Sequence, residues 1–262
     1  MKASEIAAVF EQIAPVESGI ASDRAAGFLG FRLGDPSIEV TGVGVAWWMS
    51  REVVDAAVAK GLNMLLIHEP ELWRYYESPF HTNLQAMTIP FNVRKMKLLL
   101  DHGMCVYTAH TNWDLQMDVG MGPTVAAALG FTDRIKWDVA VGVYRIDMTF
   151  GQLVAHVKES FGLDHVRCQG DDAMPIRKVV VGFGSIGSEA EAILANGADA
   201  GIFGELREWP FLHAREAGVG IIETTHTRSE SIGFAAVVRE MRLRLPNVRF
   251  EFLEVPQPYR LG

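Results

Sequence analysis

Three histidines of this chain lie directly after short apolar runs. They are His68 after MLLI, His110 after MCVYTA and His226 after GIIETT. Two of them begin the segments HTNWD and HTRSE, which end four positions later on Asp114 and Glu230. With 8 His and 32 acidic residues among 262, composition alone predicts about one such pair. The spacing is near chance, so the position of these residues in the fold must decide whether they do chemistry.

Position separates these three histidines from the other five. In open α/β sheets, ligands bind beyond the carboxyl ends of the strands, so a residue that follows a strand is a candidate functional residue. The segment HTNLQ provides a contrast, because His81 lies in a polar and aromatic loop and the segment ends on Gln85. A neutral amide is a weaker metal ligand than a carboxylate. The candidate site therefore consists of the strand-end histidines and their acidic neighbours.

The candidate set has the composition of a dinuclear metal site. It comprises His68, Glu69, His110, Asp114, His226 and Glu230. Imidazoles and carboxylates suit zinc, iron, manganese or cobalt, and six ligands give each of two divalent ions about three, with room for water. Such a site predicts hydrolytic chemistry. Each residue alone also has a structural interpretation: a strand-end His as a hydrogen-bonded residue, Glu69 as a strand terminator, and Glu230 as a first-turn helix carboxylate.

The elements that must position these residues alternate along the chain. Short apolar runs and amphipathic stretches that end on Gly are typical of an α/β fold with a largely parallel sheet. We expect two similar lobes of mixed, mainly parallel sheet flanked by helices, at residues 1–135 and 136–262, with the metal site between them at strand C-terminal ends. Strands are expected near residues 38–46, 63–68, 104–109, 138–146, 178–182, 199–203, 219–224 and 248–254. Helices are expected at the N-terminus and at REVVDAAVAKG, NVRKMKLLLDHG, TFGQLVAHVKESFG, SEAEAILANG and ESIGFAAVVREMRLRL.

Composition excludes several classes of protein. A formal charge of −8 and a pI near 5.5 argue against nucleic acid as a partner, because a phosphate-backbone binder presents a clustered basic face. The two cysteines, Cys105 and Cys168, have neither disulfide-framework nor zinc-ribbon spacing, which favours a reducing, cytoplasmic location. No run approaches the roughly 20 apolar residues of a membrane span. The aromatic stretch ELWRYYESPFH is expected in a core or subunit interface, and the tail VPQPYRLG is expected to be extended.

A second motif competes with the histidine set. Gly182, Gly184 and Gly187 spell GxGxxG between an apolar strand and a helix, and Glu205 follows the next strand. This is the fingerprint of a dinucleotide site, in which glycines admit a pyrophosphate and an acid binds the ribose. The motif comes late in the chain, whereas the full fold needs two mononucleotide halves. A smaller anion site and plain helix–sheet packing remain open for it.

Four segments together resemble one known family. IHEPELW, AHTNWD, GFGSIGSE and the block from FGELREW to HTRSE are similar, in order and spacing, to motifs of the Nif-three-like dinuclear metal centre proteins, also called GTP cyclohydrolase I type II homologs. The resemblance runs from about Gly42 to Glu230. It implies an α/β fold of two similar lobes, two divalent metals and a ring-shaped homohexamer.

The resemblance carries over residue by residue. The positions that match the family's metal ligands are His68, His110, Asp114, His226 and Glu230. Glu69 stands where the family has a second His, so one metal is expected to differ in identity or occupancy, because a carboxylate is a harder ligand. SDRAAGFLG replaces the family's Trp-Asp-Asn-x-Gly, and FGE at 203–205 replaces TGD or TGE. Substrate contacts are therefore expected to differ.

The sequence thus predicts a cytoplasmic dinuclear metal protein, and a metal-dependent hydrolase of a nucleotide-like or phosphorylated small molecule. Glu205 is the candidate general base or a partner of a ligand. Two alternatives belong to other classes: a non-catalytic, metal-dependent assembly or adaptor protein, and a dinucleotide-dependent oxidoreductase that uses GxGxxG.

Overall fold

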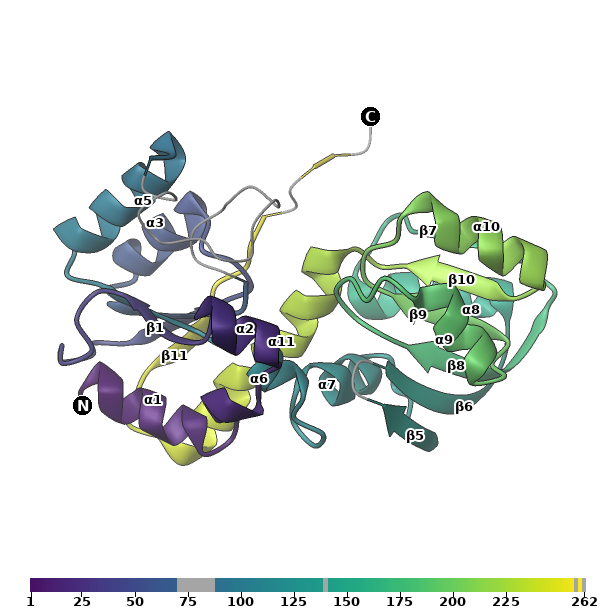
Figure 1. The fold of residues 1–262 in the computed structure, drawn as a ribbon, viewed down its shortest axis with the longest axis horizontal. Coiled ribbons are helices and arrows are strands. Elements are labelled where there is room, and N and C mark those ends of the chain that lie inside the picture. The colour runs from purple at the N-terminus through teal and green to yellow at the C-terminus, as the bar shows by residue number, and fades with distance from the viewer. Residues whose placement is uncertain (70–87, 139–140, 257–258, 261–262) are drawn as a thin grey trace. The chain divides into compact units, whose positions relative to one another are not determined.

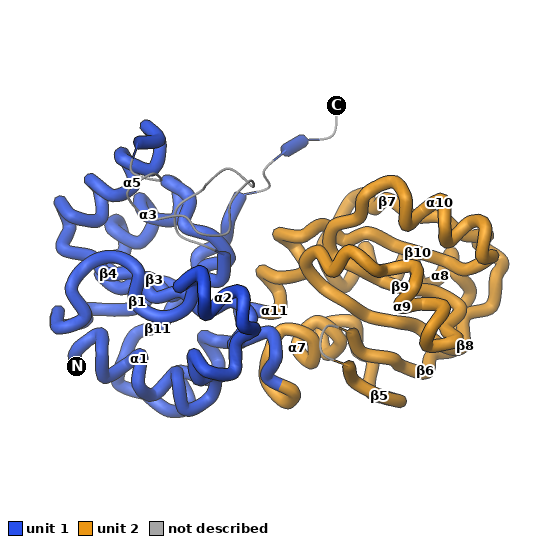
Figure 2. The backbone as a smooth tube through the Cα atoms, in the orientation of Figure 1, with its two compact units in different colours: residues 1–116, 234–262 blue, residues 117–233 orange. Residues whose placement is uncertain are grey.

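The chain folds into two compact units, each a mixed β-sheet flanked by helices (Figures 1 and 2). The structure is a computed structural model that describes residues 1–69, 88–138, 141–256 and 259–260. Unit 1 comprises residues 1–116 and 234–262, and unit 2 comprises residues 117–233. The expected α/β fold class is confirmed. The aromatic stretch, with His81 and Gln85, lies outside the described residues.

Unit 1 contains a five-stranded sheet in the order β1-β4-β3-β2-β11. Strands β2, β3, β4 and β11 are parallel, and β1 pairs with β4 in the antiparallel direction. The three central strands are buried along their whole length, as expected for continuous apolar runs covered on both faces. The strand bounds are β1 Gly30–Leu33, β2 Val43–Ala46, β3 Met64–Ile67, β4 Cys105–Thr108 and β11 Phe250–Phe252.

Helices cover both faces of this sheet (Figure 1). On one face, α3 (Arg51–Ala59) and α5 (Pro90–Asp101) pack apolar side chains against β2, β3 and β4. On the other face, α1 (Ala3–Glu11) places the ring of Phe10 5.8 Å from that of Tyr107. Two short helices, α2 (Ala21–Ala26) and α6 (Thr111–Asp114), complete the unit with a 3-10 turn at Val16–Ser18.

Unit 2 contains a six-stranded sheet in the order β5-β6-β8-β9-β10-β7. Only β8, β9 and β10 are parallel neighbours, and the remaining pairs are antiparallel. The strand bounds are β5 Arg134–Asp138, β6 Val141–Thr149, β7 Arg167–Gln169, β8 Pro175–Val181, β9 Ala200–Phe203 and β10 Gly220–Glu223. The helices are α7 Met121–Ala128, α8 Phe150–Phe161, α9 Glu189–Ala195 and α10 Glu208–Ala217.

The faces of this sheet are assigned by its side chains. Ile193 of α9 and Ala214 of α10 belong to the same core cluster as Ile221 of β10. Gly220 precedes Ile221 in β10 and therefore faces the opposite side of the sheet. A Cβ at Gly220 would lie 2.5 Å from the ring of Phe150 of α8. Helices α9 and α10 therefore cover one face and α8 the other.

Helix α11 (His226–Arg244) is longer than the sequence predicts. The expected helix began at ESIGFAA, but the structure begins it at His226, so that β10 ends at Glu223 and the expected strand 219–224 is shorter. The expected strand 38–46 is also reduced to β2, because Thr41 bonds to Asn63 and Gly61 in place of a strand ladder. Within the expected strand 138–146, Asp138 is the last residue of β5, and residues 141–146 belong to β6. No described helix is both long enough and apolar enough to cross a membrane.

Candidate metal centre

Two neighbouring parallel strands of unit 1 end at the same sheet edge and position its candidate ligands. His68 and Glu69 follow β3, and His110 follows β4 after Ala109. The peptide N–H groups of His68 and Glu69 donate to the carbonyl of Trp47, so the pairing of β3 with β2 continues past the ends of the two strands. His110 precedes α6, and the N–H of Asp114 donates to the carbonyl of His110 at 3.2 Å. One helical turn therefore connects the two candidate ligands of HTNWD.

His68 is fully buried and held by a backbone carbonyl. Its Nδ1–H donates to the carbonyl of Ala109 at 3.0 Å, and because a carbonyl only accepts, Nδ1 carries the proton. The ring also packs 5.2 Å from that of Phe234. Nε2 is thereby directed toward Asp114, whose Oδ1 lies 3.7 Å away. This is the usual arrangement of a metal-binding histidine, in which the other ring nitrogen is fixed by an oxygen.

His110 has the same arrangement with a carboxylate in place of the carbonyl. Its Nδ1–H donates to Oδ2 of Asp23 at 2.7 Å. Its Nε2 lies 3.9 Å from Oε1 of Glu69, and its ring centroid lies 4.8 Å from that of His68. One ligand atom from each of His68, Glu69 and His110 lies within 4.8 Å of the others.

These separations fit a metal ion. If both bonds are about 2.1 Å long, the 3.7 Å between His68 and Asp114 corresponds to an angle of roughly 120° at the ion, and the 3.9 Å between His110 and Glu69 to roughly 135°. Both separations are too long for a hydrogen bond. The cluster formed by His68, Glu69, His110 and Asp114, called the unit 1 cluster below, thus offers borderline nitrogen and hard oxygen donors at metal-ligand spacing.

The charge of the unit 1 cluster favours a cation. Burial lowers the pKa of His110, but the hydrogen bond to Asp23 and the nearby carboxylate charges outweigh it and raise the pKa to about 10. Burial likewise raises the pKa of Asp23, while its bonds to His110 and Thr111 reverse the shift and lower it. The carboxylates therefore stabilise positive charge at His110, which a proton supplies when no metal does.

In unit 2, a sharp turn joins β10 to α11 and positions His226. Both the N–H and the hydroxyl of Thr224 donate to the carbonyl of Phe203, which continues the pairing with β9. Thr225 has φ of 74°, a left-handed conformation that is unusual for a β-branched residue. Its hydroxyl accepts from the N–H of Arg228 in the first turn of α11. The chain thus enters α11 immediately, and His226 becomes its first residue.

His226 lies between two carboxylates of unit 2. Its Nδ1–H donates to Oε2 of Glu205 at 3.0 Å, and its Nε2 lies 3.0 Å from Oε2 of Glu230 one turn along α11. The second separation corresponds to an angle of roughly 90° at an ion with bonds of about 2.1 Å. Glu230 is buried, whereas the carboxylate of Glu205 is 57% exposed. We call His226, Glu230 and Glu205 the unit 2 cluster.

The turn that carries Glu205 is fixed by the buried carboxylate of Glu223. Glu223 accepts from the N–H of Leu206 at 3.1 Å and pairs with Arg167, which also donates to the carbonyl of Leu206. The N–H of Glu205 itself donates to the carbonyl of Gly184 at 2.7 Å. The position of Glu205 beside His226 is therefore set by strands β7 and β10 and by the glycine loop.

The GxGxxG loop lies against the unit 2 cluster. The N–H of Gly184 donates to the hydroxyl of Ser229 in α11 at 3.1 Å. A Cβ at Gly184 would lie 2.1 Å from Oε1 of Glu230, and one at Gly204 would lie 2.3 Å from the carbonyl of Gly184. Position 184 therefore has no room for a side chain, because the carboxylate of Glu230 occupies the space beside it. A negative charge at that point disfavours the pyrophosphate of a dinucleotide.

Sequence reasoning missed Asp23. The carboxylate is almost fully buried and contacts His110, although 87 positions separate them. Asp23 lies in SDRAAGFLG, the segment that differs from the family's Trp-Asp-Asn-x-Gly, and no local spacing in that segment indicates a contact with His110.

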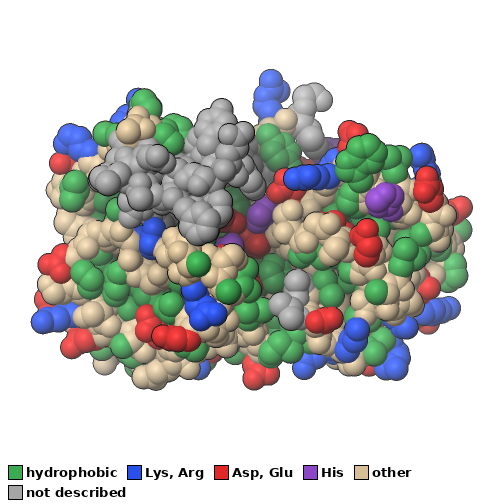
Figure 3. Space-filling model, viewed as in Figure 1, with side chains coloured by type: hydrophobic (Ala, Val, Ile, Leu, Met, Phe, Trp, Pro, Cys, Tyr) green, Lys and Arg blue, Asp and Glu red, His purple; other side chains and the backbone are tan. Residues whose placement is uncertain are grey.

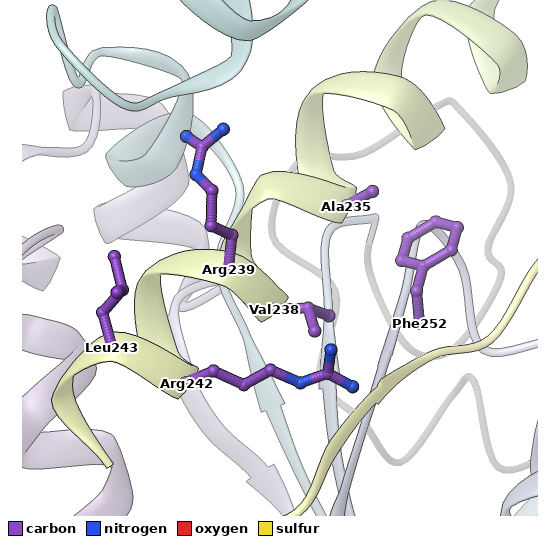
Figure 4. A pocket seen from close by; sticks show the side chains of 6 residues that line it. All are labelled: Ala235, Val238, Arg239, Arg242, Leu243 and Phe252. Atoms are coloured by element: carbon purple, nitrogen blue, oxygen red, sulfur yellow. The ribbon is translucent and has the colours of Figure 1, made fainter. Parts of the chain in front are cut away.

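A cavity of about 570 Å³ lies elsewhere in unit 1 (Figure 4). It is lined by Ala235, Val238, Arg239, Arg242, Leu243 and Phe252, and contains no member of the candidate set. Its guanidinium groups have partners, because Arg239 pairs with Glu240 and Arg242 donates to the carbonyl of Phe250. On the face shown in Figure 3, acidic and basic side chains are interspersed.

Comparison with known proteins shows which family this chain belongs to. The family model described as Duf34/NIF3 (NGG1p interacting factor 3) matches residues 1–258. A Clostridium perfringens protein named GTP cyclohydrolase 1 type 2 homolog is 27% identical, over 94% of this chain and 93% of that protein. A Lactococcus lactis protein of the same name is 30% identical, over 79% of this chain and 78% of that protein.

The same fold occurs in solved structures. The crystal structure of a Bacillus cereus protein related to NIF3 matches with a TM-score of 0.85 at 16% identity, over 100% of this chain and 99% of that one. A Staphylococcus aureus hypothetical protein matches with a TM-score of 0.83 at 20% identity, with the same coverage. Together with the match along nearly the whole sequence, these likenesses show that the chain belongs to the Duf34/NIF3 family.

Proposed function

We propose that the protein binds two divalent metal ions through His68, Glu69, His110, Asp114, His226 and Glu230, and that it is a metal-dependent hydrolase of a nucleotide-like or phosphorylated small molecule. The observation that carries the proposal is the arrangement of His68 and His110. Each ring has Nδ1 committed to an oxygen acceptor and Nε2 directed at a carboxylate oxygen 3.7 to 3.9 Å away. A histidine with only a structural role is expected to hydrogen-bond the carboxylate directly, at a distance shorter than 3.7 to 3.9 Å.

Ligand chemistry narrows the choice of metal. Three imidazoles with three carboxylates suit zinc, iron, manganese or cobalt. When bound, two such ions would supply Lewis-acid polarisation of the substrate and water of lowered pKa. Glu69 adds a negative charge where the family has a neutral imidazole, so the site would neutralise more of the charge of the two ions. Its carboxylate oxygen would also favour a harder metal at that position.

The protein's own residues orient the donors. Ala109 and Asp23 hold the rings of His68 and His110, and Glu205 holds that of His226. The contact of Glu205 with a ligand supports a positioning role. The exposure of its side chain is compatible with the alternative role of general base.

The names of the relatives bear on the substrate. The name GTP cyclohydrolase 1 type 2 homolog, printed for the proteins from C. perfringens and L. lactis, points to a nucleotide. The family description as an interacting factor instead favours the second candidate function, a non-catalytic assembly or adaptor protein. We further propose a homo-oligomer, a hexamer as the resemblance implies, in the cytoplasm; light scattering after gel filtration measures the mass.

A turnover screen separates hydrolase from adaptor. The metal-loaded protein is assayed against nucleotides and phosphoesters, and Asp114→Asn is compared with Asp118→Asn, which changes an exposed carboxylate four positions later. The hydrolase proposal predicts turnover that Asp114→Asn reduces at least tenfold and Asp118→Asn leaves unchanged. Turnover that ignores Asp114→Asn argues against catalysis at this site. Metal binding without turnover of any substrate supports the adaptor.

A further inference from the structure

The N-terminal segment of unit 1 is bound to the turn that carries His110 and Asp114. Asn112 donates through Nδ2 to the carbonyl of Ala14 at 2.8 Å. The N–H of Ile20 donates to the hydroxyl of Thr111 at 3.1 Å. Residues 14–23, called the clasp below, therefore fix the backbone of α6 through contacts that do not touch a candidate ligand.

Asp23 is the member of the clasp that does touch one. A single oxygen, Oδ2, accepts from Nδ1 of His110 at 2.7 Å, from the hydroxyl of Thr111 at 2.5 Å and from the N–H of Thr111 at 3.4 Å. The residue is 5% exposed. Of the three donors on this buried oxygen, His110 is the one that is a candidate ligand, and the two bonds from Thr111 tie Asp23 to α6.

We propose that Asp23 is a positioning residue for the metal site, which selects the tautomer and orientation of His110 and leaves Nε2 as the donor atom. A carboxylate accepts only, so Nδ1 must carry the proton. The charge of Asp23 also increases the electron density of the imidazole, which strengthens its bond to a metal. His68, by contrast, is held by the neutral carbonyl of Ala109, so the two histidines of the unit 1 cluster differ in donor strength.

This inference rests on the proposed metal binding and assigns a role to a residue outside the ligand set. The bonds from Asp23 to Thr111 stabilise the clasp, whereas the bond to His110 acts on a ligand. Two variants separate these effects. Asp23→Asn keeps the size and one acceptor oxygen but removes the charge and allows the amide to donate, which permits the wrong tautomer. Thr111→Val removes the hydroxyl bonds of the clasp and leaves the contact between Asp23 and His110.

The test is titration of the metal-free protein with Co²⁺ against a competing chelator, together with the visible absorption spectrum of the bound ion. We expect Asp23→Asn to lose roughly 10- to 100-fold in Co²⁺ affinity, the range for residues that orient a ligand, with an altered spectrum. Thr111→Val and the exposed Asp35→Asn are expected to stay within about threefold of wild type in affinity, although Thr111→Val unfolds at a lower temperature.

A second measurement reads the ring nitrogens of His110 directly, in ¹⁵N-labelled protein loaded with diamagnetic Zn²⁺ so that the ring is neutral. We expect the wild-type ring to keep its proton on Nδ1, and Asp23→Asn to show a mixture of tautomers. Wild-type protein that binds no Co²⁺ overturns the proposed function and this inference with it. Wild-type protein that binds Co²⁺, with Asp23→Asn equal to it in affinity, spectrum and tautomer, overturns this inference alone.

Discussion

Replacement of Gly184 by alanine tests whether the glycine loop makes room for a metal ligand. The two glycines Gly184 and Gly187 of GxGxxG both have positive φ, 55° and 76°. A Cβ at Gly184 meets the carboxylate of Glu230 at 2.1 Å, whereas a Cβ at Gly187 meets nothing within 4 Å. Gly187→Ala is therefore a matched control that shares the backbone change and lacks the contact.

The magnitude follows from these distances. Both variants lose about 1–2 kcal/mol of unfolding free energy, because alanine is strained in the left-handed region. In Gly184→Ala, Oε1 of Glu230 must also retreat from 2.1 Å to the 3.4 Å of an ordinary contact, a displacement of 1.3 Å. Metal–ligand distances tolerate about 0.2 Å. We therefore expect Gly184→Ala to bind Co²⁺ at least tenfold more weakly than Gly187→Ala, even where the two have similar stability.

The assays are urea denaturation of the metal-free proteins and chelator competition for affinity. If Gly184→Ala and Gly187→Ala bind Co²⁺ equally well and both match wild type, then Glu230 is not a ligand that the loop positions. If both instead lose bound dinucleotide and neither loses metal, the fingerprint interpretation of the loop is correct.

Three further predictions follow from the same geometry. The pKa of His110 is raised to about 10 from 6.5, so between these pH values a metal ion must displace a proton from the ring. The apparent metal affinity should therefore rise with pH, by up to about tenfold from pH 7 to pH 8. Competition titrations at the two pH values measure the affinity, and a flat or falling value contradicts the prediction. Chelation of metal is expected to lower the unfolding free energy by about 2.7 kcal/mol relative to protein at 100 times the dissociation constant, or roughly 5–10 °C in a thermal melt; an unchanged melt speaks against tight binding to the folded state. Phe10→Ala, which removes a fully buried ring stacked on Trp113, is expected to cost about 3–5 kcal/mol in urea denaturation, and a loss below 1 kcal/mol would show that α1 is not part of the core.

The parts of the fold that the sequence predicts are those with local patterns. MLLI and CVYT are continuous apolar runs, and both are strands at the expected positions, β3 and β4. The histidines that follow them therefore lie at one sheet edge, as predicted. Long-range pairing left no such pattern: β11 lies beside β2, about 200 residues earlier in the chain, and completes a sheet that begins in the N-terminal part.

The candidate site shows the same division. The unit 1 cluster could be predicted from strand ends, but Asp23 could not, because its partner is distant in sequence and its own helix has only six residues. His226 follows the strand β10, as expected, but it also begins α11, which the sequence did not predict. Thr225 adopts a left-handed conformation that composition does not predict for a β-branched residue. GxGxxG fits a dinucleotide site by pattern, and only the contact with Glu230 shows what Gly184 accommodates. The set of six ligands as a whole stays a prediction.

Elemental analysis of the purified protein measures the proposed two-metal site itself. We expect about two transition-metal ions per chain in wild type and in His213→Ala, which changes an exposed histidine of α10. We expect a large loss of metal in His226→Ala. Wild-type protein that contains no metal and carries a bound nicotinamide cofactor would contradict the proposed metal binding, as would a His226→Ala variant that retains both ions.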